Sequence, residues 1–248
     1  MTLEVQHISK SFGDNNVLSD VSFRLPEAHI SVLMGTNGSG KTTLFNIISG
    51  FLKPDSGQIL IDEKSTLDLE PDQIQLMGVG RTFQDLRLIG SMSVLENVML
   101  AFPKQEGEKW WNTLLPSKKV AKEQNDNLPK AIDILKLCFI EDAANQKAVD
   151  LSYGQQKLLN LACCMASGTS IWLLDEPVAG VNPAFRDQLS NVIKQQKEIG
   201  KSILVIEHNS DFITNVADEI LFLDNGVIEH FSSYQDFKSD EEVKNAYV

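Results

Sequence analysis

The segment GTNGSGKT, Gly35–Thr42, has the GxxxxGK[ST] spacing of a loop that binds phosphate groups. Its glycines let backbone N–H groups turn toward phosphate oxygens, and the helix expected to follow presents its positive amino end to them. Lys41 adds a mobile cation, and Thr42 supplies a hydroxyl group for Mg²⁺. Taken alone, this segment predicts a bound nucleotide with Mg²⁺, and the segments below narrow the nucleotide to ATP. The residues expected to bind it are Gly35, Thr36, Asn37, Gly38, Ser39, Gly40, Lys41, Thr42 and Thr43.

A second segment, IWLLDEP at Ile171–Pro177, places two carboxylates at the end of an apolar run. Because ligands gather at the carboxyl ends of strands in an α/β sheet, Asp175 is expected to hold Mg²⁺ through water. Glu176 is expected to orient and deprotonate the attacking water. An ordinary glutamate, with a pKa of about 4.3, is a weak base at pH 7, so positioning should matter more than basicity. The alternative is an acidic turn that only ends a strand.

A third segment, LSYGQQ at Leu151–Gln156, has a serine and a glycine where a helix begins. Such a helix start can bind an anion through Ser152 and the backbone at Gly154. Taken alone, this segment is a weak signal, and a plain helix cap at Ser152 is the simpler interpretation.

The apolar pattern predicts the elements that position these residues. ISVLM at Ile30–Met34 is typical of a parallel strand covered on both faces, and it leads directly into Gly35. Helical spacing follows, and Gly50 stands where that helix can end in a left-handed conformation. Later strands are expected at Ile171–Leu174, Ser202–Ile206 and Glu219–Leu223, with helical spacing between them at Phe185, Leu189, Val192 and Ile193. This alternation predicts an α/β fold, a P-loop NTPase core with a mostly parallel sheet.

Two other regions depart from that alternation. Strand patterns at Val21–Leu25 and Gly57–Asp62, beside the turn residues KPDSG, predict an amino-terminal antiparallel β lobe. Between about Ser93 and Ser167 the strand pattern stops, and helices are expected at Leu128–Ile140 and after Leu151. We therefore expect one domain, residues 1–248, with an inserted helical subdomain at about 93–167. The tail from Ser233 is expected to form short acidic amphipathic helices.

The segment Lys104–Gln124 mixes charged residues with the adjacent Trp110 and Trp111. It is interpreted either as an exposed loop with a packing anchor or as a surface for a partner. The three cysteines, Cys138, Cys163 and Cys164, have neither CxxC nor zinc spacing, so we expect them to be small core residues.

Composition limits the kinds of partner. The 248 residues carry a net charge of -12, which disfavours contact with nucleic acid and with anionic lipid headgroups. No run of about 18 apolar residues is present, and MTLEVQHISK does not have the pattern of a signal peptide. We expect a soluble cytosolic protein without a nucleic-acid partner or direct lipid insertion, whose contact with a membrane is made through another protein.

The three segments, in this order and spacing, resemble the ATP-binding subunit of ABC transporters over nearly the whole chain. The resemblance implies an ATPase that works as a dimer, in which Ser152, Gly154 and Gln155 contact ATP bound to the facing subunit. It also implies that Gln84 senses the γ-phosphate or its Mg²⁺ and touches the transporter. His208 would steady the γ-phosphate, and Phe12 would stack on adenine. Otherwise, His208 is a polar residue at a helix start and Phe12 a core aromatic.

Within that superfamily, RTFQ, YGQQ and DEPVAGVNP resemble the ATPases of branched-chain amino acid uptake systems, and urea-type systems are close by. The chain departs from the wider pattern at Tyr153, where a second glycine is common, although the branched-chain type also has tyrosine there. Leu158 and Cys163 stand where arginines are usual, and Ala28 and His29 replace a Gly-Glu pair. The catalytic set expected from the resemblance, Lys41, Gln84, Glu176 and His208, is intact.

The resemblance implies transmembrane permease subunits as partners and a peripheral location on the cytoplasmic face of the inner or plasma membrane. The second ATP-binding subunit is either a copy of this chain or a related one. Two other functions stay open: a soluble ABC ATPase that acts on nucleic acid, ribosomes or another assembly, and a binding module without hydrolysis. The first alternative usually has coiled-coil insertions, a second cassette or basic patches, and the second conflicts with the intact catalytic set.

Overall fold

The computed structural model describes residues 1–83, 86–105, 107 and 118–240. The chain forms two compact units. The first consists of Met1–Arg81, Thr169–Ala179 and Ile193–Val248, and the second of Thr82–Gly168 and Gly180–Val192. The helical subdomain expected at about 93–167 falls within the second unit. Trp110 and Trp111 lie outside the described residues.

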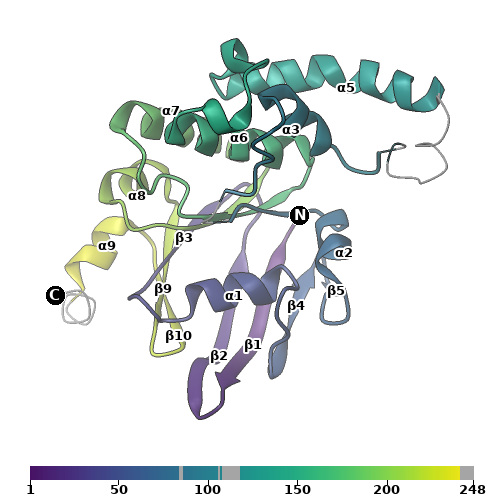
Figure 1. Ribbon diagram of the computed structural model, residues 1–248. Coiled ribbons are helices and arrows are strands. Elements are labelled where there is room, and N and C mark those ends of the chain that lie inside the picture. The colour runs from purple at the N-terminus through teal and green to yellow at the C-terminus, as the bar shows by residue number, and fades with distance from the viewer. Residues whose placement is uncertain (84–85, 106, 108–117, 241–248) are drawn as a thin grey trace. The chain divides into compact units, whose positions relative to one another are not determined.

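The larger sheet of the first unit has the strand order β10-β9-β3-β8-β7-β6 (Figure 1). Its strands are β3 (Ile30–Met34), β6 (Val79–Arg81), β7 (Ile171–Asp175), β8 (Ser202–Ile206), β9 (Glu219–Asp224) and β10 (Val227–Phe231). All pairs are parallel except β9 with β10. Every residue of β3, β7 and β8 is buried, as expected for strands covered on both faces. The strands predicted from apolar runs are confirmed.

The smaller sheet of this unit has the order β2-β1-β4-β5, and all its pairs are antiparallel. Its strands are β1 (Leu3–Phe12), β2 (Asn15–Leu25), β4 (Ser56–Ile61) and β5 (Lys64–Ser65). The predicted amino-terminal antiparallel lobe is confirmed. β1 was not predicted, because a register shift near His7, whose φ is 54°, interrupts the alternation that identifies a strand.

The helix after the phosphate loop, α1 (Lys41–Ile48), joins the two sheets into one core. Its buried side chains Leu44, Phe45, Ile47 and Ile48 pack with apolar residues of both sheets. Gly50, with a φ of 77°, follows the end of α1 in the predicted left-handed conformation. The other α-helices among the described residues of this unit are α2 (Pro71–Leu76), α8 (Ser210–Val216), α9 (Tyr234–Ser239) and the end of α7 (Pro183–Glu198).

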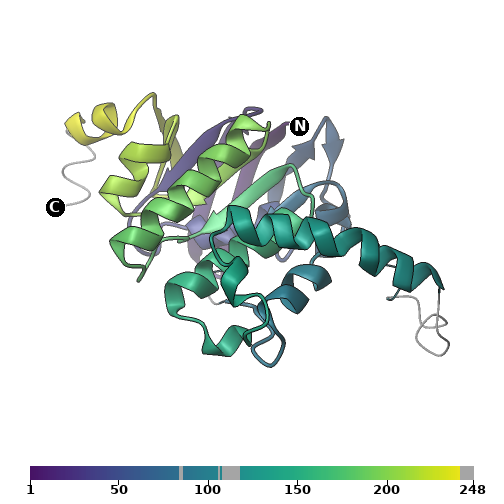
Figure 2. The ribbon, with the colours of Figure 1, turned by 90° about the horizontal axis from the view of Figure 1, so that it is seen from above.

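The second unit is helical, and α3 (Val94–Leu100), α5 (Lys118–Leu137) and α6 (Tyr153–Ala166) pack against one another (Figure 2). Two short 3₁₀ turns, Glu141–Ala143 and Ala148–Asp150, connect α5 to α6. This helix was predicted to begin at Leu128, but α5 already begins at Lys118. Its first part was missed because residues 118–130 are largely exposed and show no apolar spacing. Its predicted end at Ile140 was also late, since Phe139 has a φ of 58°.

The cysteines support the prediction that they are core residues. Cys138 and Cys164 are buried and Cys163 is half-buried. Burial raises the pKa of both Cys138 and Cys163 to about 12, so these thiols stay protonated at neutral pH.

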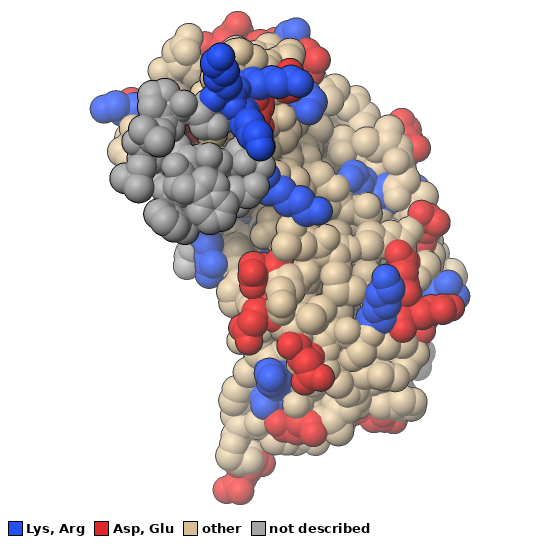
Figure 3. All heavy atoms as spheres, turned by 90° about the vertical axis from the view of Figure 1, so that its right-hand side faces the viewer, with Lys and Arg blue, Asp and Glu red and all other residues tan. Residues whose placement is uncertain are grey.

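No helix in the described part of the chain combines the length and the apolar composition needed to cross a membrane. On the face shown in Figure 3, basic and acidic side chains are mixed among uncharged ones.

Candidate functional site

The phosphate-binding segment is the connection between β3 and α1, and glycine is required at several of its positions. Gly38 and Gly40 have φ values of 86° and 105°, in the left-handed region that favours glycine. A Cβ atom on Gly35 would lie 2.3 Å from the carbonyl oxygen of Leu223, and one on Gly40 would lie 2.9 Å from Val17 and Leu18 side-chain carbons. The loop is therefore held closely against β9 and β2.

Lys41 lies folded back onto this loop. Its Nζ donates hydrogen bonds of 2.8 Å to the carbonyl oxygens of Gly35 and Thr36. Burial lowers the pKa of Lys41, while the carboxylates of Glu176 and Asp175 oppose that shift. The charge of Lys41 thus interacts with both acidic residues that the sequence selected.

The two acidic residues stand at the end of β7, as predicted. Asp175 is buried, and its Oδ2 lies 3.8 Å from Nη2 of Arg81, the last residue of β6. Glu176 has a φ of 47°, an uncommon conformation for a residue other than glycine. The N–H of Glu176 donates to the carbonyl oxygen of Ile206, at the end of the neighbouring strand β8, at 3.0 Å.

His208 follows β8 and lies near Lys41 and Glu176. Burial by its neighbours and the nearby Lys41 ammonium lower the pKa of His208, while Glu176 and Glu207 oppose the shift. Because an ordinary histidine has a pKa of about 6.5, His208 is neutral at pH 7. The structure therefore brings Lys41, Asp175, Glu176 and His208 together within the first unit.

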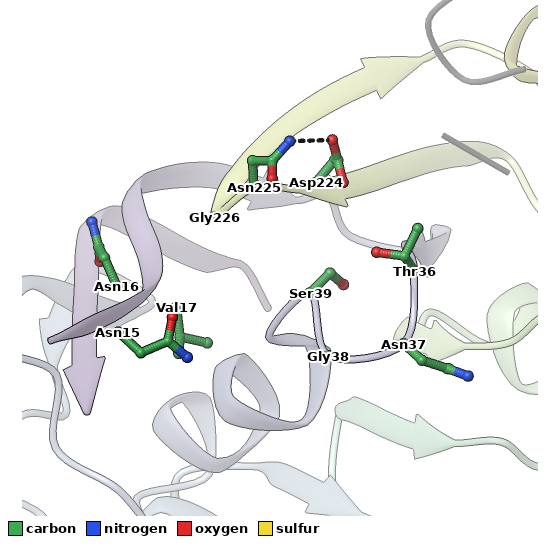
Figure 4. Close-up of a pocket in the computed structure, with 10 residues that line it drawn as sticks. All are labelled: Asn15, Asn16, Val17, Thr36, Asn37, Gly38, Ser39, Asp224, Asn225 and Gly226. Atoms are coloured by element: carbon green, nitrogen blue, oxygen red, sulfur yellow. Dashed lines mark hydrogen bonds between the residues drawn. The ribbon is translucent and has the colours of Figure 1, made fainter. Parts of the chain in front are cut away.

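A cavity of about 290 Å³ opens beside the phosphate loop (Figure 4). Figure 4 shows three segments around it: the start of β2, the phosphate loop, and the turn between β9 and β10. The lining residues are Asn15, Asn16, Val17, Thr36, Asn37, Gly38, Ser39, Asp224, Asn225 and Gly226. The backbone N–H of Ser19 donates to the carbonyl oxygen of Gly226 at 2.7 Å and ties two of these segments together.

Sequence reasoning missed the lining residues outside the phosphate loop. The sequence Asp224-Asn225-Gly226 is typical of a hairpin turn, but it does not indicate that this turn lies beside the phosphate loop. Phe12 is not among the lining residues. It ends β1 with 51% of its surface exposed, close to the segment Asn15–Val17, and Lys10 Nζ lies 5.6 Å from its ring centroid.

The segment LSYGQQ lies in the second unit and begins α6. Ser152 accepts a hydrogen bond from the N–H of Gln155, and the Gln155 side chain accepts one from the N–H of Ser152, which is a capping box. A Cβ atom on Gly154 would lie 2.7 Å from the ring of Phe185. Tyr153 is partly exposed, and its ring lies against Gly180. Leu158, one of the departures noted in the sequence, is fully buried.

Gln84 lies outside the described residues. The nearest strand before it is β6, which ends at Arg81. Arg81 itself was not selected from the sequence, although its side chain faces Asp175.

Comparison with known proteins gives the family. The family model described as ABC transporter matches residues 18–179. The high-affinity branched-chain amino acid transport ATP-binding protein LivG of Salmonella typhimurium is 34% identical over 247 residues, which cover 99% of this chain and 97% of LivG.

Solved structures of ABC transporter cassettes are also similar to this chain. An ATP-binding cassette of an ABC transporter in its ADP conformation superposes with a TM-score of 0.85 at 32% identity, covering 100% of this chain and 98% of that one. A dimeric bacterial ABC transporter cassette gives a TM-score of 0.76 at 25% identity, with 93% and 98% of the two chains covered. These similarities extend over almost the whole chain and agree with the motifs and the P-loop fold. The chain therefore belongs to the ABC transporter family, in which it is an ATP-binding subunit that hydrolyses ATP.

Proposed function

We propose that this chain powers the uptake of branched-chain amino acids, or of a related small solute, by hydrolysing ATP at a site that it shares with a second ATP-binding subunit. The observation that carries the proposal is that Lys41 of the phosphate loop lies near Asp175 and Glu176 at the end of β7 and near His208 after β8, all within the first unit. The names of the similar proteins supply the solute class.

Each residue has a role in this proposal. The backbone N–H groups from Gly35 to Thr43 bind the phosphates. Lys41 leaves the carbonyl oxygens of Gly35 and Thr36 and pairs with the phosphates instead. In hydrolysis the water oxygen forms a bond to the γ-phosphorus as the bond to the β–γ bridging oxygen breaks, and Glu176 accepts the proton of that water. His208, neutral at pH 7, donates a hydrogen bond to the γ-phosphate.

The residues present fit Mg²⁺. Thr42 offers a hydroxyl oxygen at the exposed start of α1, and Asp175 offers a carboxylate at the end of β7. Mg²⁺ usually takes only one or two protein oxygens and keeps waters and substrate phosphates. Bound Mg²⁺ would neutralise charge on the β- and γ-phosphates. Gln84 is proposed as a further ligand.

The remaining site residues act at the two ends of the nucleotide. Phe12 stacks on adenine, next to the cavity edge formed by Asn15–Val17. Ser152, Gly154 and Gln155 contact the γ-phosphate of ATP held by the second subunit, which requires the hydroxyl of Ser152 to leave Gln155 Oε1, 2.9 Å away. That subunit is a copy of this chain or a related chain, and permease subunits hold both at the cytoplasmic face of the membrane.

The catalytic part of the proposal is tested with two variants. Glu176→Gln should bind ATP with parental affinity while its turnover falls about 100-fold or more, since the amide cannot accept the proton. Lys41→Ala should weaken ATP binding itself, because it removes the cation from the phosphates. Calorimetry and phosphate release measure the two effects. Parental turnover of Glu176→Gln would show that another group is the base.

The transport part needs a different experiment. The tagged chain is recovered from detergent-solubilised membranes, and co-purifying proteins are identified by mass spectrometry. Two permease chains are expected, and a complex reconstituted in vesicles should take up labelled leucine only with ATP. Recovery of ribosomal or other soluble assemblies without permeases would contradict transport.

A further inference from the structure

Glu207 is a buried acidic residue that joins two loops of the site. It follows β8, and only 3% of its surface is exposed to solvent. Its Oε1 accepts a hydrogen bond from the backbone N–H of Val178 at 2.9 Å. Its Oε2 accepts from the N–H groups of His208 at 2.8 Å and Asn209 at 3.1 Å. One carboxylate therefore bonds to the turn after β7 and to the loop after β8.

The turn after β7 needs such support because its first residue is strained. Glu176 has a φ of 47°, and a residue other than glycine keeps that conformation only where the surrounding structure fixes it. Two backbone hydrogen bonds do so directly, from the N–H of Glu176 to Ile206 and from the N–H of Ala179 to the carbonyl oxygen of Glu176. The N–H of Val178, inside the same turn, has Glu207 as its acceptor.

We propose that Glu207 is a positioning residue for ATP hydrolysis, whose carboxylate holds the turn of Glu176 and the loop of His208 in fixed register. This inference rests on the proposed roles of Glu176 and His208. Glu207 itself contacts neither nucleotide nor water in this role. It acts through the backbone of the two loops that carry Glu176 and His208, and these two residues make the contacts with water and nucleotide.

The shape of the side chain explains why glutamate is needed. A carboxylate offers acceptors on both oxygens, so it can face three N–H donors at once. Glutamine has one oxygen and one NH₂ group, and in either orientation its NH₂ faces at least one backbone N–H. Aspartate is shorter by one C–C bond, about 1.5 Å. It can still accept from His208 and Asn209, its chain neighbours, but does not reach Val178.

Two variants of the full chain separate these contributions. In Glu207→Asp the bond to Val178 is lost and the local bonds remain. The amide of Val178 should then exchange with solvent about tenfold faster or more, measured by NMR of labelled protein. Both Glu207→Asp and Glu207→Gln should show kcat for ATP hydrolysis lowered by about 10-fold to 100-fold with KM and ATP affinity unchanged, because alignment is lost and binding is not.

Ile203→Val is the matched control. Ile203 is fully buried in β8, the strand that precedes Glu207. The variant should therefore be less stable but leave both loops intact. Its kcat should remain parental. If both Glu207 variants keep parental kcat, or if Ile203→Val loses as much kcat as they do, the inference is overturned. Glu176→Gln is assayed in parallel: parental turnover in that variant contradicts the proposed base, whereas an inactive Glu176→Gln beside fully active Glu207 variants contradicts only the role of Glu207.

Discussion

The guanidinium group of Arg81 lies 3.8 Å from the carboxylate of Asp175, and both side chains are buried. The same guanidinium donates hydrogen bonds of 2.8 Å to Asn46 and Ser49, on and just after α1. Arg81 therefore connects the end of β6, the end of β7 and the helix of the phosphate loop. Asp175, the proposed metal ligand, is thereby held by a side chain from the neighbouring strand.

Replacement of Arg81 should be strongly destabilising. Arg81→Met leaves the buried Asp175 carboxylate without this cation, which typically costs about 3–5 kcal/mol. Urea unfolding of the full chain measures the change. The control is Arg24→Met, because Arg24 lies 3.7 Å from Glu4 on the surface and exposed pairs contribute less than about 1 kcal/mol. Equal losses in the two variants would contradict the importance of burial.

Two glycines of the phosphate loop should respond differently to alanine. A Cβ atom on Gly35 would meet the carbonyl oxygen of Leu223 at 2.3 Å, whereas one on Gly38 would meet nothing within 4 Å. Gly38→Ala bears only the strain of its φ of 86°, about 1–2 kcal/mol. Gly35→Ala forces the loop away from β9 and should abolish ATP binding, as measured with a fluorescent nucleotide. Equal affinities in the two variants would be inconsistent with this packing.

A methyl group on Gly154 should disturb the start of α6 through Phe185. The added Cβ atom would lie 2.7 Å from the ring, which must move. Gly154→Ala should lower ATP turnover about tenfold while ATP affinity of the single chain stays parental, since the proposed nucleotide site lies in the first unit. Adding Phe185→Leu makes room for the methyl group and should restore part of the turnover. No restoration would mean that the ring is not the cause.

The stability of the chain should depend on the charge of His208. Its pKa in the folded chain is lowered by burial and by Lys41, so between that pKa and the ordinary value of about 6.5 the unfolded chain binds more protons. The free energy of unfolding should therefore decrease as the pH falls below about 6.5. His208→Gln lacks this titration, and its urea midpoint should change less between pH 7.5 and 5.5. An equal change in both proteins would exclude His208 as the source.

The sequence predicted those parts of the site that are local in the chain. The phosphate loop follows β3, and Asp175-Glu176 stand at the end of β7. Both strands are fully buried, and their apolar composition identifies them. Arg81, Glu207 and the residues Asn15–Val17 and Asp224–Gly226 were not selected. Their positions depend on strand order, because β6 neighbours β7, β8 lies between β7 and β3, and β9 lies beside β3. Such pairings join residues far apart in sequence, and no local pattern encodes them.

The position of β3 in the sheet also determines when the phosphate loop can form during synthesis. β3 is hydrogen-bonded on one side to β8 (Ser202–Ile206) and on the other to β9 (Glu219–Asp224), both of which are synthesised long after it. A ribosome that has released residues 1–200 has produced GTNGSGKT and both acidic residues but neither neighbour of the strand that carries the loop. Because long-range parallel pairing must wait for its partner strands, we expect the nascent chain to bind no ATP until residues 202–224 have emerged.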